Sequence, residues 1–184
     1  MVLGGRPPHG WRFIDYRRRP GIGAAAARIA GTRGYAVAVN YRERRDAADE
    51  VVADIEAAGG TAAAFSGDVG VEADVVRLFD HQLGPLTALV NSAGMTGGRT
   101  GVADYSGDDL NRLMAANVTG TMLCCREAVR HMSRAAGGQG GAIVNISSMA
   151  ASIGGRTSSV DCCTVGLAKE VGDQGVRVNT LRPG

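Results

Sequence analysis

The residues best suited to bind a charged ligand form a glycine-containing turn before an alanine-rich segment. Pro20-Gly21-Ile22-Gly23 is followed directly by the alanine run of residues 24–27. Two glycines let the backbone come close to a ligand, because neither residue carries a Cβ atom. The first N–H groups of a helix have no partner within it and carry the positive end of its dipole, which suits a phosphate. The turn therefore predicts a dinucleotide site, with a simple turn and helix cap as the alternative.

Other polar or small residues follow apolar segments farther along the chain. Four such sets end apolar runs, and a fifth lies inside a long segment with helical spacing. The sets are Asn40-Tyr41-Arg42, Gly67-Asp68-Val69, Asn91-Ser92-Ala93-Gly94, Asn145-Ile146-Ser147-Ser148 and, in the helical segment, Asn117-Val118-Thr119-Gly120. In open α/β sheets, ligands bind at the carboxyl ends of the strands, so these residues are candidates for one shared site.

Alternating strands and helices must position these sets. Apolar runs predict strands at residues 11–16, 35–40, 61–66, 86–90, 142–146 and 176–179. Helical spacing predicts helices at 21–32, 46–58, 72–83, 108–134 and 164–171. Strands that are separated by helices cannot pair as hairpins, so we expect an α/β fold with a Rossmann-like, doubly wound parallel sheet in one three-layer domain. Residues 1–10 are expected to be disordered, and residues 11–184 to form an NAD(P)-binding domain.

Composition narrows the class of protein. A chain of 184 residues is long enough for one domain with a core, and its net charge of +2 does not favour nucleic acid. No run approaches the roughly 20 apolar residues that span a bilayer, and no secretory signal is visible. The cysteines form two adjacent pairs, Cys124-Cys125 and Cys162-Cys163, without zinc-ligand spacing. We therefore expect no metal, reduced thiols and a cytoplasmic protein.

The five polar sets, in this order and spacing, resemble the classical short-chain dehydrogenase/reductase family. The resemblance covers about Ile14 to Gly184 and is strongest to the branch of 3-oxoacyl-carrier-protein reductases and sugar dehydrogenases. It implies an NADP-dependent oxidoreductase that transfers hydride between NADPH and a small carbonyl or hydroxyl compound. It also implies a small-molecule substrate, neither nucleic acid nor membrane as partner, and, for the family, a homo-oligomer.

The resemblance also assigns roles to individual residues. Cofactor contacts are implied for Gly21, Ile22 and Gly23 at the pyrophosphate, Asp68 and Val69 at the adenine ring, and Asn91, Ala93 and Gly94 beside the nicotinamide ribose. Ser148 would hydrogen-bond the substrate oxygen, and Asn117 would organise a water in the proton relay. From the residues alone, Asn117 could equally cap or kink a helix, and Ser148 could simply end a strand.

The end of the second strand bears on the choice of cofactor. A carboxylate there would bind the ribose 2′-hydroxyl of NAD and repel a 2′-phosphate. Here the strand ends in Asn40-Tyr41-Arg42, with Arg44 and Arg45 following. A guanidinium forms paired, charge-assisted bonds to a phosphate, so Asn40 and Arg42 predict NADP rather than NAD. A solvated helix start is the alternative explanation for these arginines.

Three departures from the family pattern weaken the prediction of activity. Arg17 stands where the glycine turn has its first glycine. No tyrosine follows Tyr105, and Lys169 is the only lysine, so the Tyr-x-x-x-Lys pair of the family is absent. Counting from Ser148, its tyrosine falls near Asp161-Cys162 and its lysine near Val165-Gly166, and roughly two to three helical turns are missing there. The chain also stops at Pro183-Gly184, before the family's substrate-covering loop and last strand.

These departures leave three functions open. The first is an oxidoreductase that is weakly active or inactive. The second is a non-catalytic nucleotide-binding or regulatory protein. The third is nucleic-acid binding through the arginines of residues 12–19, which we disfavour because no aromatic platform accompanies them.

Overall fold

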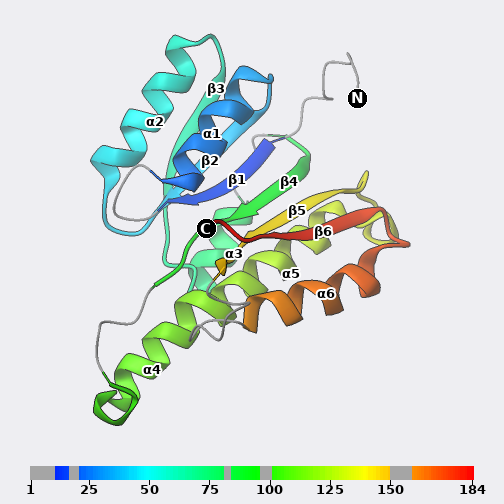
Figure 1. Ribbon diagram of the computed structural model, residues 1–184. Helices are drawn as coiled ribbons and strands as arrows, with labels where there is room; N and C mark the ends of the chain where they lie inside the picture. The colour runs from blue at the N-terminus through cyan, green and yellow to red at the C-terminus, as the bar shows by residue number, and fades with distance from the viewer. Residues whose placement is uncertain (1–10, 17–20, 81–83, 96–100, 150–158) are drawn as a thin grey trace.

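The sheet at the centre of the molecule has six parallel strands. The computed structural model describes residues 11–16, 21–80, 84–95, 101–149 and 159–184. The strands are Trp11–Tyr16 (β1), Ala36–Tyr41 (β2), Thr61–Ser66 (β3), Leu86–Asn91 (β4), Gly141–Ile146 (β5) and Val176–Leu181 (β6). Their order across the sheet is β3-β2-β1-β4-β5-β6, so the strand order reverses beside β1 (Figure 1). The expectation for residues 1–10 concerns a segment outside the described residues.

Helices cover both faces of this sheet. They are Ile22–Thr32 (α1), Arg45–Ala57 (α2), Glu72–Asp80 (α3), Gly107–Met114 (α4), Gly120–Met132 (α5) and Ser159–Val171 (α6). Helices α1 and α2 lie on one face, and α3, α5 and α6 on the other (Figure 1). A π-helical turn, Ala115–Thr119 (η2), joins α4 to α5, and short 3₁₀ turns lie at Val102–Asp104 (η1) and Arg134–Ala136 (η3). The predicted doubly wound α/β fold is confirmed.

The two faces have differently built cores. On the first face, small side chains let α1 lie close to its neighbours: a Cβ on Gly31 would lie 2.5 Å from Ile55 Cγ2. On the second face the core contains larger side chains, with Phe79, Leu89 and Met132 fully buried. Close packing of α1 thus fills a core face that contains small side chains.

Several predicted boundaries agree with the structure, and others differ. The predicted strands at 11–16 and 61–66 have the bounds of β1 and β3. Gly34 follows α1 with φ +81°, and Ser106 caps α4 by accepting from the Asp109 N–H. The predicted helix at 108–134 is interrupted by the π-helical turn. The predicted helix at 164–171 begins earlier, at Ser159, because a buried first turn extends it. Among the described helices, none is both long and apolar enough to span a membrane.

Candidate functional site

The first part of the candidate site is the N-terminus of α1. Gly21 is the N-cap of α1, with extended backbone angles of φ −131° and ψ −160°. Within the described residues no side chain caps it, and the first turn of α1 holds no acidic residue. The N-terminal N–H groups of α1 therefore lack a built-in anion, as a phosphate site requires. Arg17, where the glycine pattern is broken, lies outside the described residues.

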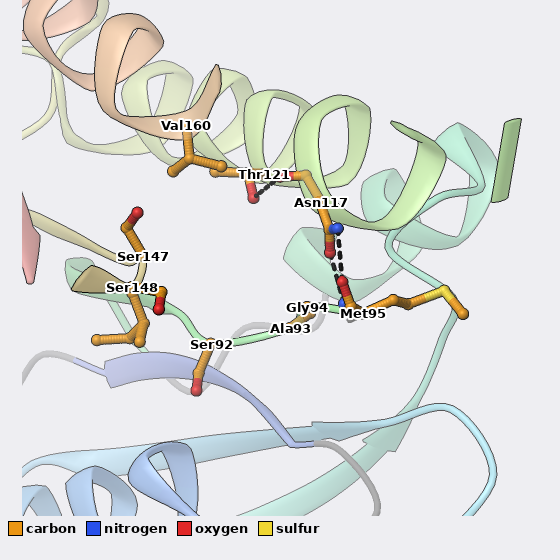
Figure 2. A pocket seen from close by; sticks show the side chains of 10 residues that line it. Ser92, Ala93, Gly94, Met95, Asn117, Thr121, Ser147, Ser148 and Val160 are labelled. Carbon is orange, nitrogen blue, oxygen red and sulfur yellow. Dashed lines mark hydrogen bonds between the residues drawn. The ribbon is translucent and has the colours of Figure 1, made fainter. Parts of the chain in front are cut away.

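A cavity of about 220 Å³ opens where β4 and β5 end, beside the π-helical turn and the start of α6 (Figure 2). Its lining residues are Ser92, Ala93, Gly94, Met95, Asn117, Thr121, Ile146, Ser147, Ser148 and Val160. Among the described residues that line it, none is charged, and four carry hydroxyl groups. The cavity therefore suits an uncharged group that forms hydrogen bonds.

Asn117 fixes the loop that forms one wall of this cavity. Its Nδ2 donates to the Met95 carbonyl at 2.8 Å, and its Oδ1 accepts from the Met95 N–H (Figure 2). Asn117 belongs to the π-helical turn and is 7% exposed. Such turns often occur at functional sites. Asn117 therefore lies in an irregular turn of the helix and also lines the cavity.

A buried chain of amides joins the ends of the central strands to α6. Asn91 and Asn145 are register partners, and Asn91 Nδ2 donates to Asn145 Oδ1 at 2.8 Å. Asn145 Nδ2 in turn donates to Thr164 Oγ1 at 2.9 Å. The Asn91 side chain is thus directed into the protein and does not line the cavity, although Ser92, Ala93 and Gly94 do.

The Cys125 thiol lies beside this amide chain. Asn91 Nδ2 donates to its sulfur at 3.4 Å, and the thiol donates to Asn145 Oδ1 at 3.6 Å. Burial raises the pKa of Cys125 to about 12, although these two contacts act in the opposite direction. A thiolate is the reactive form of cysteine, so Cys125 is an inert, structural thiol at neutral pH.

Arg42 and Asp68 lie at the ends of β2 and β3, on the other side of β1 from the cavity. Arg42 Nη1 lies 3.3 Å from Asp68 Oδ2, and the guanidinium also pairs with Glu43. The hydrogen bond to Glu43 is the main cause of the raised pKa of Arg42. Asn40 is fully buried and donates to the Gly67 carbonyl at 3.2 Å, so its amide ties the two strand ends together.

Val69 is placed differently from what a ligand-binding side chain requires. It is 6% exposed and belongs to the core on the α5 face. A Cβ on Gly120 would lie 2.8 Å from Val69 Cγ2, so α5 approaches this residue closely. Any contact of Val69 with a ligand would therefore come from its backbone.

Helix α6 presents an apolar side chain to the cavity. Val160 lines it, whereas Cys162 is exposed and Asp161 pairs with Arg182 at 2.8 Å. Neither of the two residues near the counted tyrosine position thus occupies the cavity. Lys169 is exposed two turns farther along. Among the described residues, no cluster of histidine, cysteine or acidic residues could hold a metal ion.

The structure therefore brings together part of the predicted set. Ala93, Gly94, Asn117 and Ser148 line one cavity, as their shared strand-end or helical position suggested. Ser92 and Ser147 also line the cavity, although the family resemblance assigns them no role. Thr121 was missed, although its spacing of four from Asn117 puts both on one helix face. Val160 was missed because nothing in an apolar residue indicates a ligand.

Comparison with known proteins gives consistent matches. The short chain dehydrogenase family profile matches residues 19–184. The chain is 43% identical over 176 residues to the uncharacterized oxidoreductase YgfF of Escherichia coli, covering 89% of this chain and 71% of that protein. It is 35% identical over 176 residues to the human 3-oxoacyl-[acyl-carrier-protein] reductase, covering 89% and 70%.

Solved structures agree with these matches. A short chain dehydrogenase from Burkholderia cenocepacia in complex with NADP has a TM-score of 0.85 and 28% identity, and the match covers 98% of this chain and 76% of that one. A short-chain dehydrogenase/reductase from Serratia marcescens has a TM-score of 0.84 and 30% identity, covering 95% and 74%. The whole described fold thus has close structural relatives.

Proposed function

This chain belongs to the short-chain dehydrogenase family of oxidoreductases, and from that premise we propose that it binds NADPH along the carboxyl edge of its sheet. The uncapped N-terminus of α1 at Gly21 would receive the pyrophosphate. Asp68 and the Val69 backbone would contact the adenine ring. The cavity bounded by Ala93, Gly94 and Ser148 would take the nicotinamide and the reacting carbonyl group.

The preference for NADPH over NADH rests on the end of β2. Arg42 is exposed there, and its present partners are two carboxylates at the surface. Exposed ion pairs contribute only about 0–1 kcal/mol, so a 2′-phosphate could displace them at small cost. The bound NADP in the Burkholderia relative supports the same choice.

The residues of the cavity can bind and orient a carbonyl compound. NADPH, when bound, supplies the hydride. The Ser148 hydroxyl would donate a hydrogen bond to the substrate oxygen, and Asn117 holds the wall on which the nicotinamide would rest. We propose a small 3-oxoacyl or sugar-like carbonyl compound as substrate, as the resemblance implies.

Proton transfer is the weak step of this site. Reduction leaves an alkoxide, which must receive a proton from a positioned acid. Among the residues of α6 whose side chains the structure describes, Val160 lines the cavity, and it has no proton to give. The sequence also has no Tyr-x-x-x-Lys pair. We therefore propose slow carbonyl reduction or none. Val160 is also the observation that favours a non-catalytic nucleotide-binding protein as the second candidate.

One experiment separates the two candidates. NADPH is titrated into the purified chain and followed by its fluorescence, and ketone-dependent loss of NADPH absorbance is then measured in the same preparation. Saturable binding without turnover selects the nucleotide-binding protein. Turnover selects the enzyme, and failure to bind either NADPH or NADH would overturn the proposal.

A further inference from the structure

Thr121 is a cavity residue whose hydrogen-bond capacity is defined by one contact. Its Oγ1 donates to the main-chain carbonyl of Asn117 at 3.0 Å, one helical turn earlier (Figure 2). A carbonyl oxygen can only accept, so the single hydroxyl proton of Thr121 lies in this bond. Thr121 is 7% exposed, so bulk water has little access to it. Towards the cavity, its oxygen therefore offers lone pairs only.

The neighbouring amide of Asn117 is engaged with the loop after β4. Asn117 uses its Oδ1 and a proton of Nδ2 on the backbone of Met95. These contacts direct the side-chain amide of Asn117 toward the loop. The main-chain carbonyl of Asn117 accepts the hydrogen bond from the Thr121 hydroxyl. On the helix side of the cavity, the observed acceptor is therefore the Thr121 oxygen, whereas the Asn117 amide is engaged with Met95 as both donor and acceptor.

The opposite wall has different capabilities. Ser92, Ser147 and Ser148 follow β4 and β5, line the cavity and each carry a hydroxyl group. A serine hydroxyl can donate as well as accept, so this wall suits a carbonyl oxygen. A ligand that spans the cavity meets serine hydroxyl groups that can donate on one side and the accepting Thr121 oxygen on the other.

We propose that Thr121 is a ligand-binding residue that accepts a hydrogen bond from a hydroxyl group of the substrate. The cavity then takes carbonyl compounds that carry a hydroxyl group close to the carbonyl carbon, in preference to those with an apolar group in its place. This rests on the proposed function only in taking the ligand to be a carbonyl compound. A bound water could supply the same O–H donor, and the test below separates the two sources.

Hydroxyacetone and 2-butanone provide a matched pair of probes, because a hydroxyl group in the first replaces a methyl group in the second. Their dissociation constants for the wild-type chain are measured by ligand-observed NMR titration, with and without saturating NADPH. One net hydrogen bond predicts tighter binding of hydroxyacetone by about two- to tenfold. Equal affinities, or no binding of either probe, would overturn the proposal and would leave water as the partner of Thr121.

Two variants at this position test the assignment. Thr121→Val keeps the shape of the side chain and removes its oxygen, so the preference for hydroxyacetone should disappear. Thr121→Ser keeps the hydroxyl, so the preference should remain within about twofold. A preference retained in a folded T121V protein would overturn the proposal. If T121V does not fold, the wild-type and T121S titrations still decide it.

The NADPH titration keeps this result distinct from that of the proposed function. Loss of NADPH binding with an intact hydroxyacetone preference would remove the proposed function and leave Thr121 as a binding residue. Normal NADPH binding with equal affinities for the two ketones would keep the proposed function and would remove Thr121 as a ligand-binding residue.

Discussion

Asn117 binds the main chain of Met95 through both ends of its amide, as donor to the carbonyl at 2.8 Å and as acceptor from the N–H. The two residues lie 22 positions apart, and the contact joins the π-helical turn to the loop after β4. The side-chain amide thus donates one hydrogen bond to a backbone amide and accepts one from it, as paired strands do in a sheet. It holds one wall of the cavity in place.

We predict that Asn117→Ala destabilises the protein by about 1–3 kcal/mol and weakens NADPH binding, because the partly buried main-chain groups of Met95 lose their partners. Urea denaturation and NADPH titration measure the two effects. Asn111→Ala removes an exposed asparagine from α4 and should change stability by less than about 0.5 kcal/mol. Equal losses for the two variants would contradict the role of the contact.

The fold was predictable because the polar sets end apolar strands that alternate with helices. The position of a residue at the cavity was predictable only where it follows directly from the end of a strand, as for Gly94 and Ser148. Side-chain direction was harder to obtain. Asn91 lies two residues after Leu89, on the strand face that packs toward α5, so its amide turns inward. The partner of the Asn91 amide depends on the register of β4 and β5, which places Asn145 opposite Asn91.

Two further features could not be read from the sequence. The π-helical turn changes no apolar spacing that would mark it, and it depends on contacts of Asn117 with a loop far away in the chain. The early start of α6 coincides with burial of its first turn, where the Thr164 hydroxyl donates to the Val160 carbonyl at 2.7 Å and accepts from Asn145 Nδ2. Both are tertiary effects that override local preference.

We predict that Arg42→Ala weakens NADPH binding by about 1–3 kcal/mol and changes NADH binding much less, because only NADPH offers a phosphate to the guanidinium. Fluorescence titrations with both cofactors measure the difference. Arg45→Ala is the control, since Arg45 is exposed nearby and pairs with Asp49 on α2. Equal losses for NADPH and NADH in the Arg42 variant would show that this residue does not touch the 2′-phosphate.

We predict that alkaline pH destabilises the fold through Cys125. Its pKa rises from 9.0 to about 12 in the folded protein, so the folded state retains a proton that the unfolded state releases. The contribution is fully present below the unfolded pKa and is lost as pH rises through the interval from 9.0 to about 12, at up to about 1.4 kcal/mol per pH unit.

Urea denaturation at a series of alkaline pH values checks this prediction. Cys125→Ala should remove part of the slope, whereas Cys162→Ala, at an exposed thiol, should leave it unchanged. Identical slopes in all three proteins would assign the alkaline loss of stability to other groups.

We predict that Gly120→Ala destabilises the protein by about 1–3 kcal/mol, because overpacking forces α5 away from the backbone of Val69. The added Cβ would lie 2.9 Å from the Val69 carbonyl oxygen, which cannot move as a flexible side chain can. Gly166→Ala is the matched control within α6, where a Cβ meets nothing within 4 Å. That change should stabilise the helix by about 0.5–1 kcal/mol, as measured by thermal denaturation.

Tyrosine variants of α6 test the proton-transfer step. Because Val160 lines the cavity and Cys162 is exposed, we expect Cys162→Tyr to leave carbonyl reduction at the wild-type level. Val160→Tyr places a phenol in the cavity and should raise the rate. It should still stay below about 1 per second, an ordinary enzyme rate, because the residue one helical turn later is Thr164 and not a lysine that could lower the pKa of the phenol.

A lysine cannot simply be added one turn after such a tyrosine. That position is Thr164, which is buried and bonded to Asn145, so a lysine there would break the amide chain that anchors α6. The proton donor, the ribose anchor and the helix length would have to be rebuilt together, because the effects on the rate of groups that act as one unit are not additive. Initial rates of NADPH oxidation with a ketone test the pair of tyrosine variants, each checked for folding by circular dichroism. A C162Y protein that outpaces V160Y would show that a different face of α6 serves the cavity.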